Sequence, residues 1–222
     1  MKPKICVSIL PKTVTEAQDL IKKAEDDRAD LIEVRLDLLK ESNALSTLTS
    51  HSKTPLIATN RNKATAQIDR AQMLLQVAKT GFEYVDLDIH DTNIKENIKE
   101  LQNLGAKPII SFHNKNGPMA LIELEKILKQ EIENGAEVCK IVTTAQTFKD
   151  NLIMLDFVEK ASLKAKIVCF AMGDKGKISR LLSPVFGAYF TFAHLDGTSE
   201  TAPGQMTIQQ MRAAYGLLGI TT

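Results

Sequence analysis

Lys140 and His113 are the residues of this sequence best suited to covalent chemistry. Lys140 lies in Val-Cys-Lys-Ile-Val (138–142), an apolar run typical of a buried strand. Burial disfavours the charged form of a lysine, and the free amine can attack a ketone to form a Schiff base. His113 follows another apolar run (108–112), and an imidazole can transfer protons near neutral pH. Considered singly, Lys140 could instead extend to solvent, and His113 could be structural.

Other polar residues that could line a binding site lie near the ends of apolar runs. Glu33 and Arg35 are two residues apart, and residues i and i+2 of a strand share one face. These two side chains could bind a ligand or simply pair with each other. Arginines bind carboxylates or phosphates through paired hydrogen bonds, which indicates an anionic ligand. The candidate site residues beside Lys140 and His113 are Ser8, Glu33, Arg35, Arg61, Asp88, Arg180, Thr201 and Gln205.

The elements that must position these residues alternate along the chain. Eight β-like runs cover 4–10, 30–36, 55–59, 84–89, 108–112, 138–142, 166–172 and 189–193. Amphipathic helical patterns cover 14–28, 67–80, 93–104, 119–134, 147–163, 178–183 and 207–218, with Thr13 as the N-cap of the first. Strands that alternate with helices form a parallel sheet.

The alternation predicts an α/β fold, a single-domain (β/α)₈ TIM barrel that spans residues 1–222. An open doubly wound sheet is the main alternative, but it usually has a glycine-rich turn after its first strand, and residues 9–13 contain no glycine. In a barrel, functional groups gather at the carboxyl ends of the strands. The candidate residues fall near these ends.

Composition excludes several functional classes. The net charge is +1, so nothing indicates binding to nucleic acid or to an anionic membrane surface. No apolar stretch approaches the length of about 20 residues that spans a bilayer, and the segment before the first strand is too short for a secretory signal. Three cysteines without a C-x-x-C pair fit reduced thiols in a cytoplasmic protein. No metal site is expected, since the chain also lacks H-E-x-x-H.

The chain resembles type I 3-dehydroquinate dehydratase over essentially its whole length. The resemblance rests on a set of motifs that occur in the family's order. They are Glu33-Val-Arg35-Leu-Asp37, Asp86-Leu-Asp88, Ser111-Phe-His113, Lys140, Ile178-Ser-Arg180-Leu and Thr201-Ala-Pro-Gly-Gln205. The resemblance implies a dehydration of the small molecule 3-dehydroquinate to 3-dehydroshikimate in the shikimate pathway, which leads to chorismate and the aromatic amino acids. It implies a homodimer and no cofactor.

The resemblance also implies a role for each site residue. Lys140 would form the imine with the C3 ketone, and His113 would be the general acid and base. Asp88 falls where the family has a glutamate that orients the histidine. Arg180 would bind the substrate carboxylate. Glu33, Arg35 and Arg61 would bind the ring hydroxyls and their surroundings, and Ser8, Thr201 and Gln205 would complete the pocket, the last two from a loop that closes over it.

Three departures from the family pattern are visible in the sequence. Asp88 is one methylene shorter than the family's glutamate, and Thr201 replaces a common serine. Asn62-Lys-Ala-Thr-Ala-Gln67 replaces a Glu-Gly-Gly turn, so the third loop is expected to differ.

Two other functions stay open. A class I aldolase-like Schiff-base lyase acting on a sugar phosphate could bind phosphate at Gly173-Asp-Lys-Gly-Lys177, although a plain turn is the simpler interpretation. A non-catalytic barrel that works as a binding protein is the other alternative.

Overall fold

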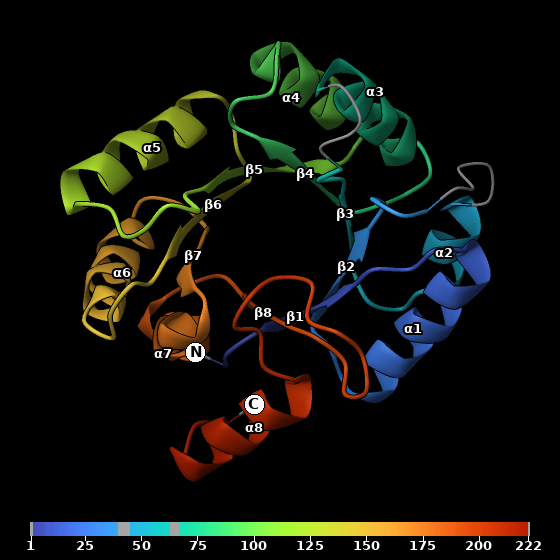
Figure 1. The fold of residues 1–222 in the computed structure, drawn as a ribbon. Coiled ribbons are helices and arrows are strands. Elements are labelled where there is room, and N and C mark those ends of the chain that lie inside the picture. Colours follow the sequence, from blue (N-terminus) through green and yellow to red (C-terminus); the bar gives the residue numbers. More distant parts are fainter. Residues whose placement is uncertain (1, 40–44, 63–66, 222) are drawn as a thin grey trace.

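Eight parallel strands form a nearly closed barrel in the residues that the structure, a computed structural model, describes, namely 2–39, 45–62 and 67–221 (Figure 1). The strands follow one another around the barrel in chain order, and the last pairs with the first. The predicted (β/α)₈ barrel is confirmed, and the open doubly wound alternative is wrong. The strands are β1 (Ile5–Ile9), β2 (Leu31–Arg35), β3 (Leu56–Thr59), β4 (Tyr84–Asp88), β5 (Lys107–His113), β6 (Val138–Thr144), β7 (Ile167–Met172) and β8 (Thr191–Ala193).

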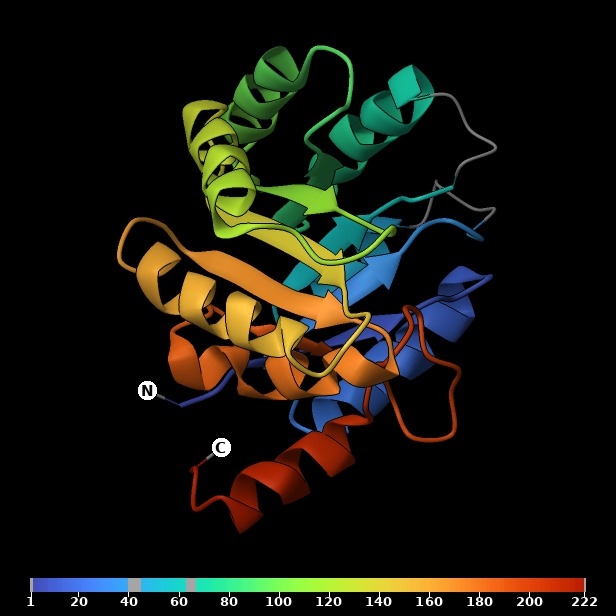
Figure 2. The same cartoon turned by 60° about the vertical axis from the view of Figure 1, so that its left-hand side comes forward.

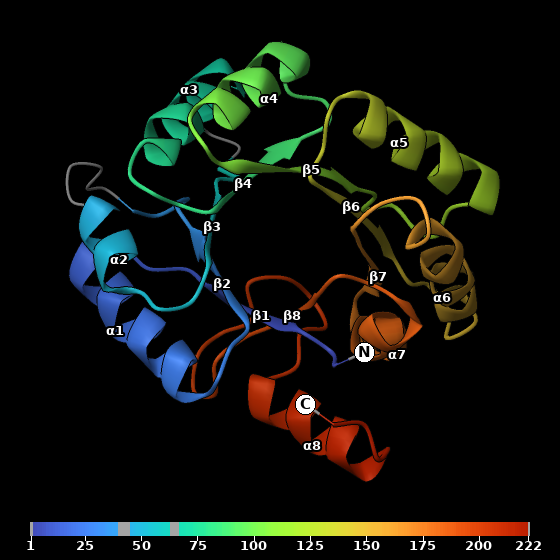
Figure 3. The same cartoon turned by 180° about the vertical axis from the view of Figure 1, so that it is seen from behind.

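The helices lie outside the barrel and cover the strands, as Figures 1 and 3 show from opposite ends. Thr13 is the N-cap of the first helix, as predicted, because its side chain accepts a hydrogen bond from the backbone N–H of Glu16 at 3.1 Å. The helices are α1 (Val14–Asp26), α2 (Leu45–His51), α3 (Gln67–Ala78), α4 (Ile94–Asn103), α5 (Leu121–Glu133), α6 (Asp150–Ala161), α7 (Lys177–Leu182) and α8 (Ile208–Leu217), with two short 3₁₀ turns, η1 (Asp174–Gly176) and η2 (Ser183–Phe186).

Helix α2 is absent from the elements predicted from the sequence. Its seven residues, Leu-Ser-Thr-Leu-Thr-Ser-His, contain mostly weak helix formers. Leu45 and Leu48 are buried in the core around the barrel. Packing of these two leucines, rather than local propensity, therefore stabilises α2.

Side chains inside the barrel lie in layers because alternate residues of each strand point inward. The layer near the amino ends of the strands is apolar and contains Cys6, Leu31, Ile57, Tyr84, Ile109, Val138, Val168 and Phe190. Two residues further along each strand, the next layer contains Ser8, Glu33, Thr59, Asp86, Ser111, Lys140, Phe170 and Phe192. The barrel interior thus changes from apolar to polar toward the carboxyl ends of the strands.

The barrel is closed differently between β7 and β8 than elsewhere. No ladder joins these two strands among the described residues, and the backbone N–H of Tyr189, just before β8, donates to the carbonyl of Ile167 at 2.7 Å. Inside this seam the rings of Phe170 and Phe192 meet edge to face, with centroids 6.3 Å apart. A side view shows the long loop between β8 and α8 at the carboxyl ends of the strands, opposite the two termini (Figure 2).

Candidate active site

Lys140 points into the barrel from β6 and is 5% exposed. Its neighbours along the strand, Cys139 and Ile141, point to the helices and belong to the outer core. The Nζ atom donates to Oδ2 of Asp86 at 2.8 Å and lies 3.7 Å from Oε1 of Glu33. Strand alternation therefore directs the Lys140 side chain inward, and two carboxylates hold its amine there. The alternative in which Lys140 extends to solvent is wrong.

Asp86 connects Lys140 to Arg61. The carboxylate is 1% exposed, and Oδ1 accepts from the Arg61 guanidinium at 2.5 Å and from the Ser111 hydroxyl at 2.6 Å. Although burial opposes ionisation, the charges of Arg61 and Lys140 hold the pKa of Asp86 well below its usual range. Asp86 is therefore ionised at neutral pH and pairs with two cations in the floor of the site.

His113 ends β5 on the strand next to Lys140, where it pairs in register with Val142. The side chain is half-buried, and among the described residues no group makes a hydrogen bond to its ring. Burial, followed by the charges of Arg61 and Lys140, lowers the pKa of His113 well below its usual range. A neutral imidazole at the carboxyl end of β5 is available to accept a proton from a ligand.

Glu33 connects the barrel to the loop after β8. Its carboxylate accepts from the Ser8 hydroxyl and, at 2.9 Å, from the Thr59 hydroxyl. Ser8 in turn accepts from the Thr201 hydroxyl at 2.8 Å. The carbonyl oxygen of the Gln205 side chain accepts from the backbone N–H of Thr201 at 2.8 Å. This chain of hydrogen bonds places the 201–205 segment over the site.

Arg180 lies on α7 and is 1% exposed, yet no carboxylate pairs with it in the described part of the chain. One guanidinium nitrogen donates to the carbonyl of Pro203 at 3.1 Å, the Nε atom has no hydrogen-bond partner, and the group lies 4.2 Å above the Phe170 ring. Burial lowers the pKa of Arg180. A buried cation with unused donors is suited to bind an anion that arrives with the substrate.

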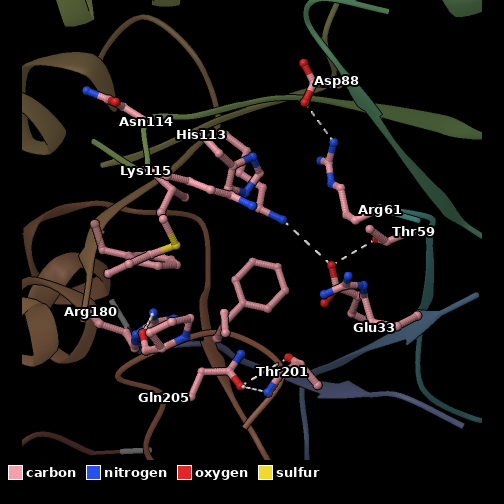
Figure 4. A pocket seen from close by; sticks show the side chains of 18 of the residues that line it. Glu33, Thr59, Arg61, Asp88, His113, Asn114, Lys115, Arg180, Thr201 and Gln205 are labelled. Carbon is pink, nitrogen blue, oxygen red and sulfur yellow. Dashed lines mark hydrogen bonds and ion pairs between the residues drawn. The ribbon is translucent and has the colours of Figure 1, made fainter. Parts of the chain in front are cut away.

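A cavity of about 530 Å³ joins these residues. In the close view, Glu33, Thr59 and Arg61 lie on the side opposite Arg180 (Figure 4). Thr201 and Gln205 belong to the loop between β8 and α8. Val142, Phe170, Met172 and Phe192 supply an apolar wall. All predicted site residues except Ser8 line this cavity, and Ser8 lies behind Glu33.

Asp88 does not contact His113, and of the two alternatives for Arg35 the pairing with Glu33 is wrong. Asp88 accepts from Arg61 at 3.1 Å and from the backbone N–H of His90 at 3.0 Å, and it makes no hydrogen bond to His113. Arg35 does not pair with Glu33, because both of its contacting nitrogens donate to Asp37 at 2.8 Å. Most of the third-loop segment in which a departure is expected, 62–67, lies outside the described residues, which omit 63–66.

Sequence reasoning missed the central position of Asp86. The aspartate enters the sequence analysis only as part of the motif Asp86-Leu-Asp88, and its contact with Lys140 requires the register between β4, β5 and β6. Ser111, opposite Lys140 on β5, was recognised only as part of a motif. The alternation of polar residues along β4 and β5 is the sequence pattern that could have indicated that Asp86 and Ser111 point into the barrel.

The 173–177 turn does not contribute to the cavity. Lys177 pairs with Asp174 at 2.8 Å, and Lys175 donates to the carbonyl of Gln146 at 2.8 Å. Within the described ranges, no group of three or more His, Cys, Asp or Glu side chains is arranged to hold a metal ion. No helix in the described portion of the chain is long and apolar enough to cross a membrane.

Comparisons with known proteins agree with this geometry. The family model for type I 3-dehydroquinase matches residues 5–222. A 3-dehydroquinate dehydratase of Dehalococcoides mccartyi is 34% identical over 96% of this chain and 95% of its own. One from Pyrococcus abyssi is 31% identical, over 97% and 98%. The crystal structure of type I 3-dehydroquinate dehydratase from Clostridium difficile with covalently modified comenic acid is 26% identical, with a TM-score of 0.88 over 98% of this chain and 92% of that one.

Proposed function

Because the chain belongs to the type I 3-dehydroquinase family, we propose that it dehydrates 3-dehydroquinate through a Schiff base on Lys140. The activity itself, that of a 3-dehydroquinate dehydratase, follows from the family and the curated relatives. The observation that carries the covalent mechanism is the position of Lys140, a buried amine that opens onto the cavity beside His113.

The first step is formation of the imine. The amine of Lys140 attacks the C3 ketone, and the carbonyl oxygen leaves as water. The amine must first lose a proton. We assign the acceptance of this proton to the neutral imidazole of His113 on the neighbouring strand, because Asp86, 2.8 Å from the amine, stays ionised. Phe192 lies below the ammonium, with 4.4 Å between Nζ and the ring centroid. Its aromatic face stabilises the positive charge of an iminium ion at the same position.

The second step is the elimination of water. The iminium accepts the electrons left at C2 when a proton departs, which makes that C–H acidic. His113 takes this proton, because burial and the nearby cations keep the imidazole neutral. The protonated imidazole then returns the proton to the departing C1 hydroxyl, which leaves as water. Hydrolysis of the imine frees Lys140 and releases 3-dehydroshikimate.

Different residues bind the carboxylate and the hydroxyl groups of the substrate. Arg180 binds the carboxylate, which gives the buried guanidinium the counter-ion that it lacks. Glu33, Arg35 and Arg61 face the ring hydroxyls, and Thr201 and Gln205 close the pocket from the loop after β8. We assign Asp88 an indirect role, since it neutralises Arg61 rather than bonding to His113.

The family resemblance also supports a homodimer that acts in the cytoplasm, and we propose both. Light scattering at several protein concentrations tests the first, since a homodimer has twice the chain mass of 24.5 kDa. A particle of single-chain mass at all concentrations contradicts it. Fractionation of the cells that express the protein tests the second.

Borohydride trapping tests the mechanism. The protein is incubated with 3-dehydroquinate, reduced, digested and analysed by mass spectrometry. A reduced adduct on Lys140 that is absent from Lys140→Ala supports the proposal. Turnover of 3-dehydroquinate without an adduct on Lys140 eliminates the Schiff base but leaves the activity. Loss of both would redirect the search to sugar-phosphate ketones, the substrates of an aldolase-like lyase.

A further inference from the structure

The cations that line the cavity fall into two groups. Within the described residues, four of them are already paired with carboxylates: Arg35 with Asp37, Arg61 with Asp86 and Asp88, Arg70 with Asp91, and Lys140 with Asp86. The other two lining cations, Arg180 and Lys115, have no carboxylate partner in the same residues. An anionic ligand therefore meets two uncompensated positive charges in this cavity.

These two charges differ in depth. Arg180 is 1% exposed and lies beneath the Pro203 carbonyl. Lys115 is exposed and follows β5 at the mouth of the cavity. An exposed ammonium keeps its water and can exchange ligands, whereas a buried guanidinium binds an anion that has lost its water. The arrangement separates an outer cation from an inner one.

The backbone that carries Lys115 is held in place. The amide oxygen of the Asn114 side chain accepts from the backbone N–H of Asn116 at 3.0 Å, which forms a tight turn around Lys115. Two side chains from the end of β6 and the segment after it fix the turn, since the Thr144 hydroxyl donates to the Asn114 carbonyl at 3.0 Å and the Gln146 amide donates to the Asn116 carbonyl at 3.1 Å. The base of the side chain is thus fixed at the rim.

We infer that Lys115 is an outer binding position for the substrate carboxylate, which meets Lys115 at the rim before it reaches Arg180. This role rests on the proposed function, because it takes 3-dehydroquinate as the substrate. Association of an anion with a cavity is faster when an uncompensated positive charge lies at its mouth, and salt screens this effect. Lys115 therefore acts on capture of the substrate and contacts no reacting atom.

The same charge reaches the catalytic histidine. Lys115 is two residues after His113. Burial and the charges of Arg61 and Lys140 lower the pKa of His113 most, the charge of Asp86 raises it, and the charge of Lys115 lowers it further. Loss of the Lys115 charge therefore moves the pKa of His113 upward. A residue that only shaped the loop would leave this pKa unchanged, so the histidine reports on the charge directly.

Lys115→Met and Lys115→Glu test the inference, with Lys126→Met, an exposed lysine of α5 outside the cavity, as the matched control. Steady-state kinetics are measured at about 20 mM and about 500 mM salt, between which the Debye length shortens several-fold. At low salt we expect kcat/KM to fall about threefold to tenfold in Lys115→Met and further in Lys115→Glu, with kcat unchanged. At high salt the three variants converge on the wild type.

The pH dependence of kcat/KM is the second measurement. We expect its acidic limb to move to higher pH in Lys115→Met and to stay in place in Lys126→Met. Equal kcat/KM for Lys115→Met and the wild type at low salt overturns the inference, and so does a defect that salt does not reduce. Wild-type turnover is the separate check on the proposed function, because an inactive wild type rejects the function and leaves these comparisons without a substrate.

Discussion

The ammonium nitrogen of Lys140 lies 2.8 Å from Oδ2 of Asp86, and both side chains are almost fully buried. The pair links the proposed nucleophile to the network of Arg61 and Ser111 on the same carboxylate. Lys140 therefore has a fixed position before substrate arrives. A ketone that enters the cavity meets an amine whose orientation is set by the floor of the barrel.

Asp86→Asn tests this link. The variant leaves Lys140 and Arg61 without the carboxylate that they share, and breaking a buried ion pair costs about 3–5 kcal/mol. We expect the free energy of unfolding to fall by about that amount, together with kcat, as measured by urea denaturation and steady-state kinetics. Asp156→Asn is the control, because Asp156 pairs with Lys160 at 2.7 Å on the exposed face of α6 and such pairs contribute at most about 1 kcal/mol. If Asp86→Asn and Asp156→Asn lower the free energy of unfolding by similar amounts, burial of the ion pair does not determine the loss.

Arg180→Met separates substrate binding from folding. The guanidinium is buried without a counter-ion, so replacing it with an apolar side chain of similar length should raise the melting temperature of the ligand-free protein. Substrate affinity should fall about 100-fold, since a charged hydrogen-bonded pair with the carboxylate is lost. Differential scanning fluorimetry with and without a substrate analogue measures both effects. A variant that is less stable than the wild type and still binds the analogue rejects this role for Arg180.

The pH dependence of kcat/KM reports on His113. The general base must be neutral, and burial with the nearby charges of Arg61 and Lys140 lowers the pKa of His113 well below its usual range. A lowered pKa moves the acidic limb of the profile to lower pH, so kcat/KM should stay constant from neutral pH down past about 6.5, the ordinary histidine value. His51→Ala, an exposed histidine of α2, should leave the limb in place. A limb centred at or above about 6.5 in the wild type would mean that the imidazole is not in this environment.

Glu131 makes stability depend on pH. This residue of α5 is 0% exposed, and neither carboxylate oxygen has a hydrogen-bond partner. Burial raises the pKa of Glu131 well above its usual range, in a position next to the Cys139 thiol on β6. A raised pKa gives a contribution to stability that is complete below the ordinary glutamate pKa of about 4.3 and is lost as the pH rises through the raised value.

Glu131→Met removes this dependence. We expect the variant to be more stable than the wild type by about 1–3 kcal/mol at neutral pH, with a smaller difference at pH 5, as measured by urea denaturation. Glu125→Met on the exposed side of the same helix is the control and should change stability by less than about 0.5 kcal/mol at either pH. Parallel pH profiles for Glu131→Met and the wild type rule out Glu131 as the source.

The fold could be predicted from the sequence because the long elements repeat one simple pattern. Apolar runs such as 138–142 alternate with helical patterns such as 119–134, and both strand and helix were confirmed as β6 and α5. The missed helix α2 shows where the method fails, since its Ser- and Thr-rich sequence forms a helix only because Leu45 and Leu48 pack on the core. Propensity is a local property, and packing is not.

The site could be predicted as a set of residues but not as a set of contacts. Strand alternation directs Lys140, Glu33 and His113 into one cavity, as expected. The partner of each charge depends on register between strands and on rotamers, which one sequence does not encode in a readable way. Arg35 therefore pairs with Asp37 rather than Glu33, and Asp88 pairs with Arg61 rather than with His113. The contact of Lys140 with Asp86 was not predicted.

In the part of the chain that the structure describes, β7 and β8 are joined by one backbone hydrogen bond, from Tyr189 to Ile167, where the other neighbouring strands form ladders. Amide protons near this seam should therefore exchange with deuterated solvent through a local opening that costs much less than global unfolding. Strand β8 also leads into the 201–205 segment and carries Phe192. Ligand contacts with this loop and with the Phe192 ring should suppress the local opening. Slower amide exchange at the seam would then report that the cavity is occupied, without a change in the rest of the fold.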